Sequence, residues 1–220
     1  MRASPFAMER ITMAAPQPPS ADDADIVLRV PVQVPRAMTH AWERRFSRSI
    51  LHTFGWSMRG ELPDVPKAIV IGAPHSSNWD GIWVYFAATA MGIDIRILGK
   101  PVLFKIPVLN FILRRYGGMP ADDNSGRNML EHATALFRDA DRFWFGIAPE
   151  GTRRQVLRWK IGFWKIAKQA NVPIVLVYLH YPDKVIGVAG TFTPTDDMRG
   201  DIERIREMYR PWQGKHHGVE

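Results

Sequence analysis

The sequence predicts an α/β domain in which a mainly parallel central sheet is flanked by helices. Three nearly continuous apolar runs have the length of buried strands: 68–73 (AIVIGA), 142–148 (RFWFGIA) and 173–179 (PIVLVYL). Stretches with helical periodicity separate them, at 77–91, 125–139 and 160–170. Strands that alternate with helices and are apolar on both faces are typical of a parallel sheet covered on both sides.

The rest of the chain continues this alternation. Further strands are expected at 56–61, 94–98 and 184–190. Further helices are expected at 102–115, with an interruption at Pro107, and at 197–209. These elements together predict a single domain over residues 56–215.

The N-terminal part divides into two segments. Residues 1–35 are rich in Pro and Ala and predict a disordered or loosely attached arm. Residues 36–55 predict an amphipathic helix, because apolar residues recur there every four positions. That stripe consists of Met38, Trp42, Phe46, Ile50 and Phe54. Such a helix either docks on the core or lies in a membrane interface, and a helix docked at a membrane-facing edge would do both.

Composition limits the classes of function. The chain has 220 residues, 29 Lys and Arg against 22 Asp and Glu, and no cysteine. Disulfides, thiolate metal sites and a cysteine acyl-enzyme are therefore excluded. The basic balance favours phosphate-bearing partners, although ordinary solubility explains it equally well. The apolar run 81–93 is shorter than the roughly 18 residues that a spanning helix needs, and no secretory signal is visible, so we expect a cytoplasmic location.

The stretch 75-HSSNWD-80 places a histidine and a carboxylate where a predicted strand ends and a predicted helix begins. Ligands bind at the carboxyl ends of strands in open α/β sheets. His75 can accept a proton at neutral pH, and Asp80 could orient its ring. The alternative is structural: Ser77 and Asp80 also form the sequence pattern of a capping box, which would need no catalytic histidine.

A second polar turn, 148-APEGTR-153, follows another predicted strand. Backbone N–H groups in such a turn, together with the Arg153 guanidinium, suit a phosphate group. The alternative is a surface turn with incidental charge. If both turns lie at the same sheet edge, they would face one pocket.

These two stretches resemble conserved blocks of the glycerolipid acyltransferases, the family that includes 1-acyl-sn-glycerol-3-phosphate acyltransferase. HSSNWD resembles their H-x4-D block, and PEGTR resembles their third block. Residues 98–122 resemble the second block and 172–177 the fourth, while 159–179 and 193–197 are similar to a short bacterial branch. The resemblance covers about residues 56–215 and its four blocks stand in the expected order.

The resemblance implies transfer of a fatty acyl group from a thioester to the hydroxyl of a lysophospholipid. It implies His75 and Asp80 as the catalytic pair. The residues expected to bind substrate are Glu150, Gly151, Thr152, Arg153 and Lys100. Acyl-CoA or acyl-carrier protein would be the co-substrate, with no cofactor and no metal. The expected acceptor is 1-acyl-sn-glycerol-3-phosphate, which would give phosphatidic acid at the inner face of the cell membrane.

One departure affects the substrate. The second block of this family usually carries an Arg directly after the Asp that matches Asp122, and this chain has Asp123 there. The sequence therefore does not identify the acceptor headgroup. It also leaves a second interpretation, in which the chain is a noncatalytic or hydrolytic relative that binds lysolipids. Trp79, Trp83, Phe104 and Phe111 are either acyl-chain contacts or ordinary core residues.

Other classes of function find little support. A serine hydrolase should carry a G-x-S-x-G elbow, which does not occur here. A metal enzyme should carry metal ligands at a characteristic spacing, such as H-E-x-x-H, and none is found. The pair His216–His217 near the C-terminus is only a weak indication of a metal site. No RNP-like aromatic motif or zinc finger predicts nucleic-acid binding.

Overall fold

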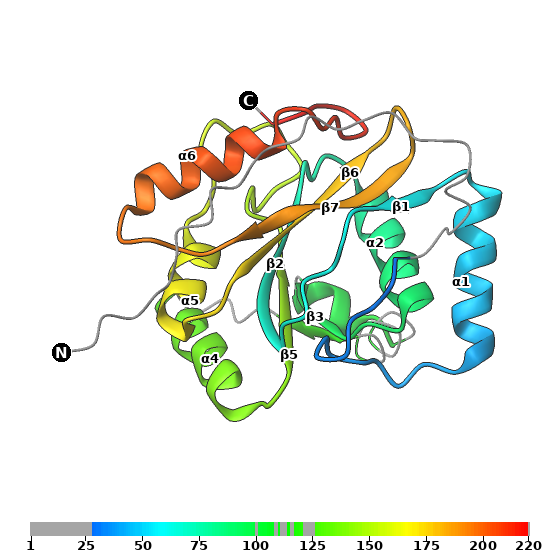
Figure 1. Cartoon of the computed structure of the whole chain (residues 1–220), viewed down its shortest axis with the longest axis horizontal. Coiled ribbons are helices and arrows are strands. Elements are labelled where there is room, and N and C mark those ends of the chain that lie inside the picture. Colours follow the sequence, from blue (N-terminus) through cyan, green and yellow to red (C-terminus); the bar gives the residue numbers. More distant parts are fainter. Residues whose placement is uncertain are drawn as a thin grey trace, which may run out of the picture.

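The computed structural model describes residues 28–99, 101–107, 110, 114, 117–120 and 126–219. These residues form one seven-stranded sheet with the strand order β1-β7-β6-β2-β5-β3-β4, flanked by helices (Figure 1). The predicted fold class is confirmed. The strands are β1 (Ser57–Arg59), β2 (Lys67–Ala73), β3 (Ile95–Gly99), β4 (Gly118–Pro120), β5 (Phe143–Ile147), β6 (Ile174–His180) and β7 (Val185–Phe192). The helices are α1 (Ala41–Thr53), α2 (Asn78–Met91), the 3-10 helix η1 (Pro101–Lys105), α4 (Gly126–Asp139), α5 (Gly162–Ala170) and α6 (Met198–Tyr209).

The sheet is parallel except where β6 meets β7. Strand β2 lies between β5 and β6 and runs parallel to both, with Ile71 opposite Ile147 and Ala73 opposite Tyr178. Helices α2, α4 and α5 lie in the chain between β2 and β3, β4 and β5, and β5 and β6, whereas a short turn joins β6 to β7 and makes that pair antiparallel. The carboxyl ends of β2, β5 and β6 consequently meet at one edge of the sheet.

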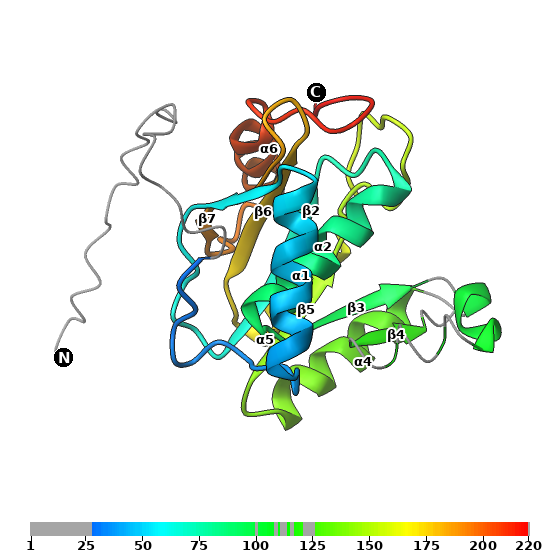
Figure 2. The ribbon, with the colours of Figure 1, turned by 90° about the vertical axis from the view of Figure 1, so that its right-hand side faces the viewer.

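Alternate side chains of the central strands fill two separate cores. On β2, Ile69 and Ile71 pack with the helices α4, α5 and α6, while Ala68 and Val70 face the opposite layer. Helix α2 covers that opposite face, and α1 packs along α2 on its outer side (Figure 2). Because residues on both faces of the strands are buried, the strands read as continuous apolar runs in the sequence.

The structure differs from the prediction at one strand and one helix. Strand β4 is absent from the prediction, because three residues that include Gly118 and Pro120 carry no strand pattern. The helix predicted over 102–115 begins as the short 3-10 helix η1, in which Pro101 occupies the first position. Most of the stretch after Pro107 lies outside the described residues, as do residues 1–27, Lys100, Phe111 and Asp123.

The aromatic stripe of α1 is largely exposed at its N-terminal end. Its buried residues are Glu43, Ser47 and Leu51, which lie on the side that faces α2. Met38, just before the helix, is 90% exposed and Trp42 is 65% exposed. The stripe is therefore exposed at its N-terminal end, whereas the partly buried Ile50 packs against the core and Phe46 contacts Phe86 of α2. Of the described helices, none has the length and apolar character needed to cross a bilayer.

The segment before α1 packs on the domain. Val34 is fully buried, and Leu28 and Val30 pack against the same cluster of core residues. Arg36 forms an isolated antiparallel bridge with Ile93. The boundary at residue 35 that the sequence suggested for a loose arm thus falls inside a packed segment.

Candidate active site

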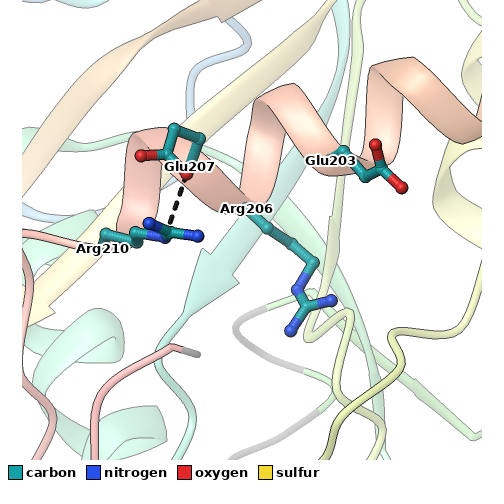
Figure 3. A pocket seen from close by; sticks show the side chains of 4 residues that line it. All are labelled: Glu203, Arg206, Glu207 and Arg210. Carbon is teal, nitrogen blue, oxygen red and sulfur yellow. Dashed lines mark ion pairs between the residues drawn. The ribbon is translucent and has the colours of Figure 1, made fainter.

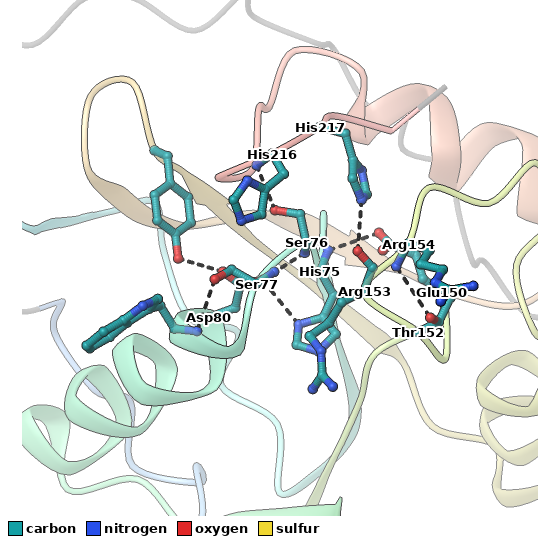
Figure 4. A network of polar contacts seen from close by, with 12 residues as sticks. His75, Ser76, Ser77, Asp80, Glu150, Thr152, Arg153, Arg154, His216 and His217 are labelled. Carbon is teal, nitrogen blue, oxygen red and sulfur yellow. Dashed lines mark hydrogen bonds and ion pairs between the residues drawn. The ribbon is translucent and has the colours of Figure 1, made fainter.

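His75 and Asp80 come together where β2 ends and α2 begins. The His75 Nδ1 atom lies 3.3 Å from Asp80 Oδ2 (Figure 4). The His75 side chain is 26% exposed, whereas the Asp80 side chain is only 2% exposed. A proton on Nδ1 would be held by the carboxylate, and this arrangement leaves Nε2 as the nitrogen able to accept a proton.

Asp80 is fixed by several donors besides His75. Its Oδ2 atom accepts hydrogen bonds from the backbone N–H groups of Ser76 and Ser77, both at 2.8 Å. Its Oδ1 atom accepts one from the Tyr181 hydroxyl at 2.6 Å. Burial by itself would raise the pKa of Asp80, but the hydrogen bonds from His75, Tyr181 and Ser77 hold that pKa below its usual value. The carboxylate is therefore ionised at neutral pH.

Asp80 has both of the roles that the sequence suggested, in the helix cap and in contact with His75. Ser77 is the N-cap of α2, and its hydroxyl accepts from the Trp79 N–H at 3.2 Å. Asp80 completes the capping box by accepting from the Ser77 N–H. One carboxylate thus closes the helix start and contacts His75, since Oδ2 serves both tasks. The cap fixes the position of the carboxylate relative to the imidazole ring.

The PEGTR turn lies beside this pair because β5 is the parallel neighbour of β2. Glu150 is 4% exposed, and its Oε1 atom accepts a hydrogen bond from the His75 N–H at 3.0 Å. Its Oε2 atom is buried, and no described residue gives it a hydrogen-bond partner. Burial raises the pKa of Glu150, and the hydrogen bond from His75 and the nearby His217 only partly offset this effect. Glu150 therefore joins the two turns through the His75 backbone.

Gly151 and Lys160 shape the tip of the turn. Gly151 has φ +65°, a conformation that favours glycine. A Cβ atom at Gly151 would also lie 2.9 Å from Lys160 Nζ, so the lysine side chain runs directly over the glycine. Thr152 Oγ1 accepts from the Arg154 N–H at 3.3 Å, and the Arg153 side chain is exposed. The turn presents cations and backbone to solvent beside His75, as a site for an anion would.

Sequence reasoning missed three parts of this site. Tyr181 follows β6 and lies 101 positions from Asp80 in the chain. Lys160 covers the PEGTR turn from just before α5. The tail pair His216 and His217 lies over both turns (Figure 4). The polar residues that directly follow strand 173–179 were a usable signal for Tyr181, since β6 ends at the same sheet edge as β2.

An aromatic row runs from α1 to the His75 loop. Phe54 contacts Trp83 at 5.4 Å between ring centroids, and Trp83 stacks on Trp79 at 6.1 Å. Trp83 is buried, whereas Trp79 is 48% exposed. The Lys215 ammonium lies 5.7 Å from the centre of the Trp79 ring. The row places apolar surface next to the candidate catalytic pair.

Other features lie apart from these residues. A hollow on α6 is lined by Glu203, Arg206, Glu207 and Arg210, and Glu207 pairs with Arg210 along the helix (Figure 3). None of these side chains belongs to the two turns. Lys105 is exposed on η1, and Phe104 beside it is half-buried. Within the described ranges, no group of three or more His, Asp or Glu residues is arranged to hold a metal ion.

The comparisons with known proteins define the class of protein. The family model described as Acyltransferase matches residues 58–180, which is more than half of the chain. The chain therefore belongs to this acyltransferase family. The matched region contains both turns and Tyr181 follows it directly.

A solved structure shares the fold. The crystal structure of the 1-acyl-sn-glycerophosphate (LPA) acyltransferase PlsC from Thermotoga maritima aligns with a TM-score of 0.54 and 18% sequence identity. The alignment covers 76% of this chain and 78% of that chain. No curated protein matches the sequence.

Proposed function

We propose that this chain transfers a fatty acyl group from an acyl thioester to the free hydroxyl of a lysophospholipid. The observation that carries the proposal is the pairing of partly exposed His75 with buried Asp80, beside a cationic turn. The acceptor that fits best is 1-acyl-sn-glycerol-3-phosphate, which would yield phosphatidic acid. Its hydroxyl needs a base, and its phosphate needs a cation nearby.

In the proposed mechanism, the acceptor hydroxyl is the nucleophile. His75 Nε2 takes the hydroxyl proton while the oxygen attacks the thioester carbonyl. The tetrahedral intermediate then collapses as the carbon–sulfur bond breaks, and His75 returns the proton to the leaving thiolate. An ester and a free thiol, of CoA or of acyl-carrier protein, are the products. No protein nucleophile is required, which agrees with the absence of cysteine.

Asp80 and the PEGTR turn have separate tasks in this proposal. Asp80 keeps the proton of His75 on Nδ1 and stabilises the imidazolium that forms during the reaction. Arg153 binds the acceptor phosphate, while Gly151 leaves room for the Lys160 side chain and Thr152 holds the turn by accepting from the Arg154 N–H. Glu150 holds the turn against the His75 loop through its hydrogen bond to the His75 N–H. Lys100, outside the described residues, is a further cation proposed for the substrate.

We also propose that the enzyme works at a membrane surface, on the cytoplasmic side. The support is the exposed N-terminal end of the aromatic stripe of α1 and the aromatic row from Phe54 to Trp79. The row offers apolar contact for an acyl chain that leaves the bilayer. Replacing Trp42 and Phe46 with Ser should weaken binding to anionic liposomes and leave the helical content unchanged. Undiminished sedimentation with liposomes would contradict this membrane assignment.

The reaction itself is tested by product analysis. Radiolabelled long-chain acyl-CoA, and separately acyl-carrier protein, would be incubated with the protein and a panel of lysophospholipids. The proposal predicts a labelled diacyl lipid with lysophosphatidate as the best acceptor. Free labelled fatty acid at the same rate with and without acceptor would instead identify a hydrolase. Lysolipid binding without any turnover, from either donor, would identify a noncatalytic lipid binder.

A further inference from the structure

The last described residues fold back over the candidate site. We call residues 212–219 the C-terminal turn. Its base is anchored at the carboxyl end of β6. Trp212 stacks on Tyr178 of that strand at 3.6 Å between ring centroids, and the Tyr181 N–H donates to the Gln213 carbonyl at 2.9 Å. Gln213 pairs with Gly218, which closes the turn. The tip therefore has a fixed position relative to the sheet edge.

The tip contacts both catalytic loops. The His216 N–H donates to Ser76 Oγ at 3.2 Å, in the loop after β2. The His217 Nε2 atom lies 3.3 Å from the carbonyl oxygen of Arg153, in the loop after β5 (Figure 4). Ser76 and His216 are 140 positions apart in the chain. One short segment thus spans the two loops that must cooperate in acyl transfer.

The contact at His217 has a defined direction. A carbonyl oxygen only accepts, so the Nε2 atom must carry the proton when it bonds to Arg153. The other ring nitrogen, Nδ1, lies 3.0 Å from the Gly218 carbonyl oxygen. A neutral imidazole donates to one of the two carbonyls, and a protonated ring donates to both.

The approach of the tip to Ser76 also depends on a glycine. A Cβ atom at Gly214 would lie 2.6 Å from Ser76 Oγ and 2.8 Å from the His217 carbonyl oxygen. At Gly218 the nearest atom to such a Cβ is the Trp212 carbonyl oxygen, at 3.3 Å. A methyl group at Gly214 would therefore collide with Ser76, whereas one at Gly218 would be tight only against the Trp212 carbonyl oxygen, within the C-terminal turn itself.

We propose that the C-terminal turn positions the PEGTR turn for the acceptor, with His217 as the positioning residue that holds the Arg153 backbone. The inference rests on the proposed function, in which Arg153 binds the acceptor phosphate. The contact from His217 acts on the backbone of the residue whose exposed side chain would bind the phosphate, and it adds to the local hydrogen bond from the Gly151 N–H to the Ala148 carbonyl. His217 acts through Arg153 and does not itself touch the reacting atoms.

Three substitutions at His217 test the proposal. His217→Ala removes the bond to Arg153, His217→Gln places an amide N–H near the Nε2 position, and His217→Asn places one near the Nδ1 position. We expect Ala and Asn to raise the KM for lysophosphatidate about 10-fold, with kcat and the KM for acyl-CoA changed less than about 2-fold. Gln should restore the KM to near the wild-type value. The control is His132→Ala, on an exposed face of α4.

Hydrogen exchange tests the tether without requiring activity. His217→Ala and Gly214→Ala should speed exchange in a peptide covering residues 149–154, whereas Gly218→Ala and His217→Gln should not. A peptide covering β5 should exchange as in the wild type in all variants, which shows that the domain is folded. Unchanged exchange at 149–154 in His217→Ala overturns the proposal, and so does an equal KM in the Ala, Asn and Gln variants. If the wild-type protein transfers no acyl group, only the proposed function is refuted. The exchange result still tests whether His217 holds the Arg153 backbone.

Discussion

The loop after β2 and the loop after β5 lie side by side, yet they are held very differently. In the first, the Asp80 carboxylate accepts from two backbone N–H groups and one tyrosine hydroxyl and also contacts His75. In the second, the Glu150 carboxylate accepts one hydrogen bond and keeps one buried oxygen without a partner among the described residues. The pKa of Asp80 is lowered and that of Glu150 is raised.

The difference indicates that the two loops have separate functions, the His75 loop in the chemical step and the PEGTR turn in binding the acceptor. The His75 loop is preorganised, because its carboxylate is satisfied before any substrate arrives. The PEGTR turn exposes Gly151 and Arg153, and the long-range contact from His217 to the Arg153 carbonyl adds to its local hydrogen bonds. We therefore expect changes in the first loop to lower kcat and changes in the second to raise the KM of the acceptor.

Among the residues that support His75 or bind the acceptor, the largest effect is expected at Asp80. Asp80→Asn keeps the size of the side chain but removes the charge that stabilises the imidazolium, so kcat should fall about 100- to 1,000-fold. The folded-state pKa of Asp80 is lowered, so its ionised form stabilises the fold above its ordinary pKa, and that stability is lost as pH falls through the lowered pKa. The variant should accordingly melt at a lower temperature at pH 7. Asp141→Asn, which changes an exposed carboxylate before β5, is the control and should alter neither quantity.

Arg153 should show the opposite kinetic signature. Arg153→Ala should raise the KM for lysophosphatidate about 10- to 100-fold while kcat changes much less, because a bidentate contact to phosphate is lost. Arg154→Ala is the matched control, since Arg154 is the next exposed arginine of the same turn. Equal effects of the two variants on steady-state kinetics would mean that the turn attracts substrate only through its total charge.

A smaller effect is expected at Tyr181. Tyr181→Phe removes the hydrogen bond to Asp80 Oδ1 and leaves the ring in place against Trp56. One hydrogen bond to a charged group stabilises a fold by about 1.5–3 kcal/mol, so chemical denaturation should show a loss of this order. We expect kcat to fall about 3- to 10-fold, because Asp80 keeps its backbone donors and its charge. A kcat as low as that of Asp80→Asn would mean that Tyr181 takes part in the reaction directly.

The smallest effect on activity is expected at Glu150, where stability should increase. Glu150→Gln keeps an oxygen to accept from the His75 N–H and removes a buried charge. The folded-state pKa of Glu150 is raised, so its ionised form destabilises the fold at neutral pH, and this penalty disappears as pH falls below the ordinary pKa. The variant should melt at a higher temperature than wild type at pH 7, and the difference should vanish near pH 4. A lower melting temperature at pH 7 would show that an undescribed partner pairs with the carboxylate.

Much of the fold and half of the site could be predicted because they depend on local pattern. Continuous apolar runs were enough to predict β2, β5 and β6. The strand order in the structure then places HSSNWD and PEGTR at one edge of the sheet, as expected for parallel strands. The sequence predicted two roles for Asp80, in a capping box with Ser77 and in contact with His75, and the structure shows both contacts. Short-range spacing is enough for features of this kind.

The remaining features depend on contacts that leave no local pattern. The hydrogen bond from Tyr181 to Asp80 and that from His216 to Ser76 join segments more than 100 positions apart. The stripe on α1 predicted an amphipathic helix but not which side faces the core, since Glu43 and Ser47 are buried there instead. Strand β4 is defined by its pairing with β3, while its own composition is unfavourable for a strand.

The most direct test of the account is the rate of acyl transfer by His75→Ala. Formation of labelled diacyl lipid from acyl-CoA and lysophosphatidate would be measured for this variant, wild type and His132→Ala, with circular dichroism to verify folding. The account predicts that His75→Ala loses activity at least about 1,000-fold and that His132→Ala stays within about 2-fold of wild type. A folded His75→Ala variant that retains more than about a tenth of the wild-type rate would contradict the assignment of His75 as the base.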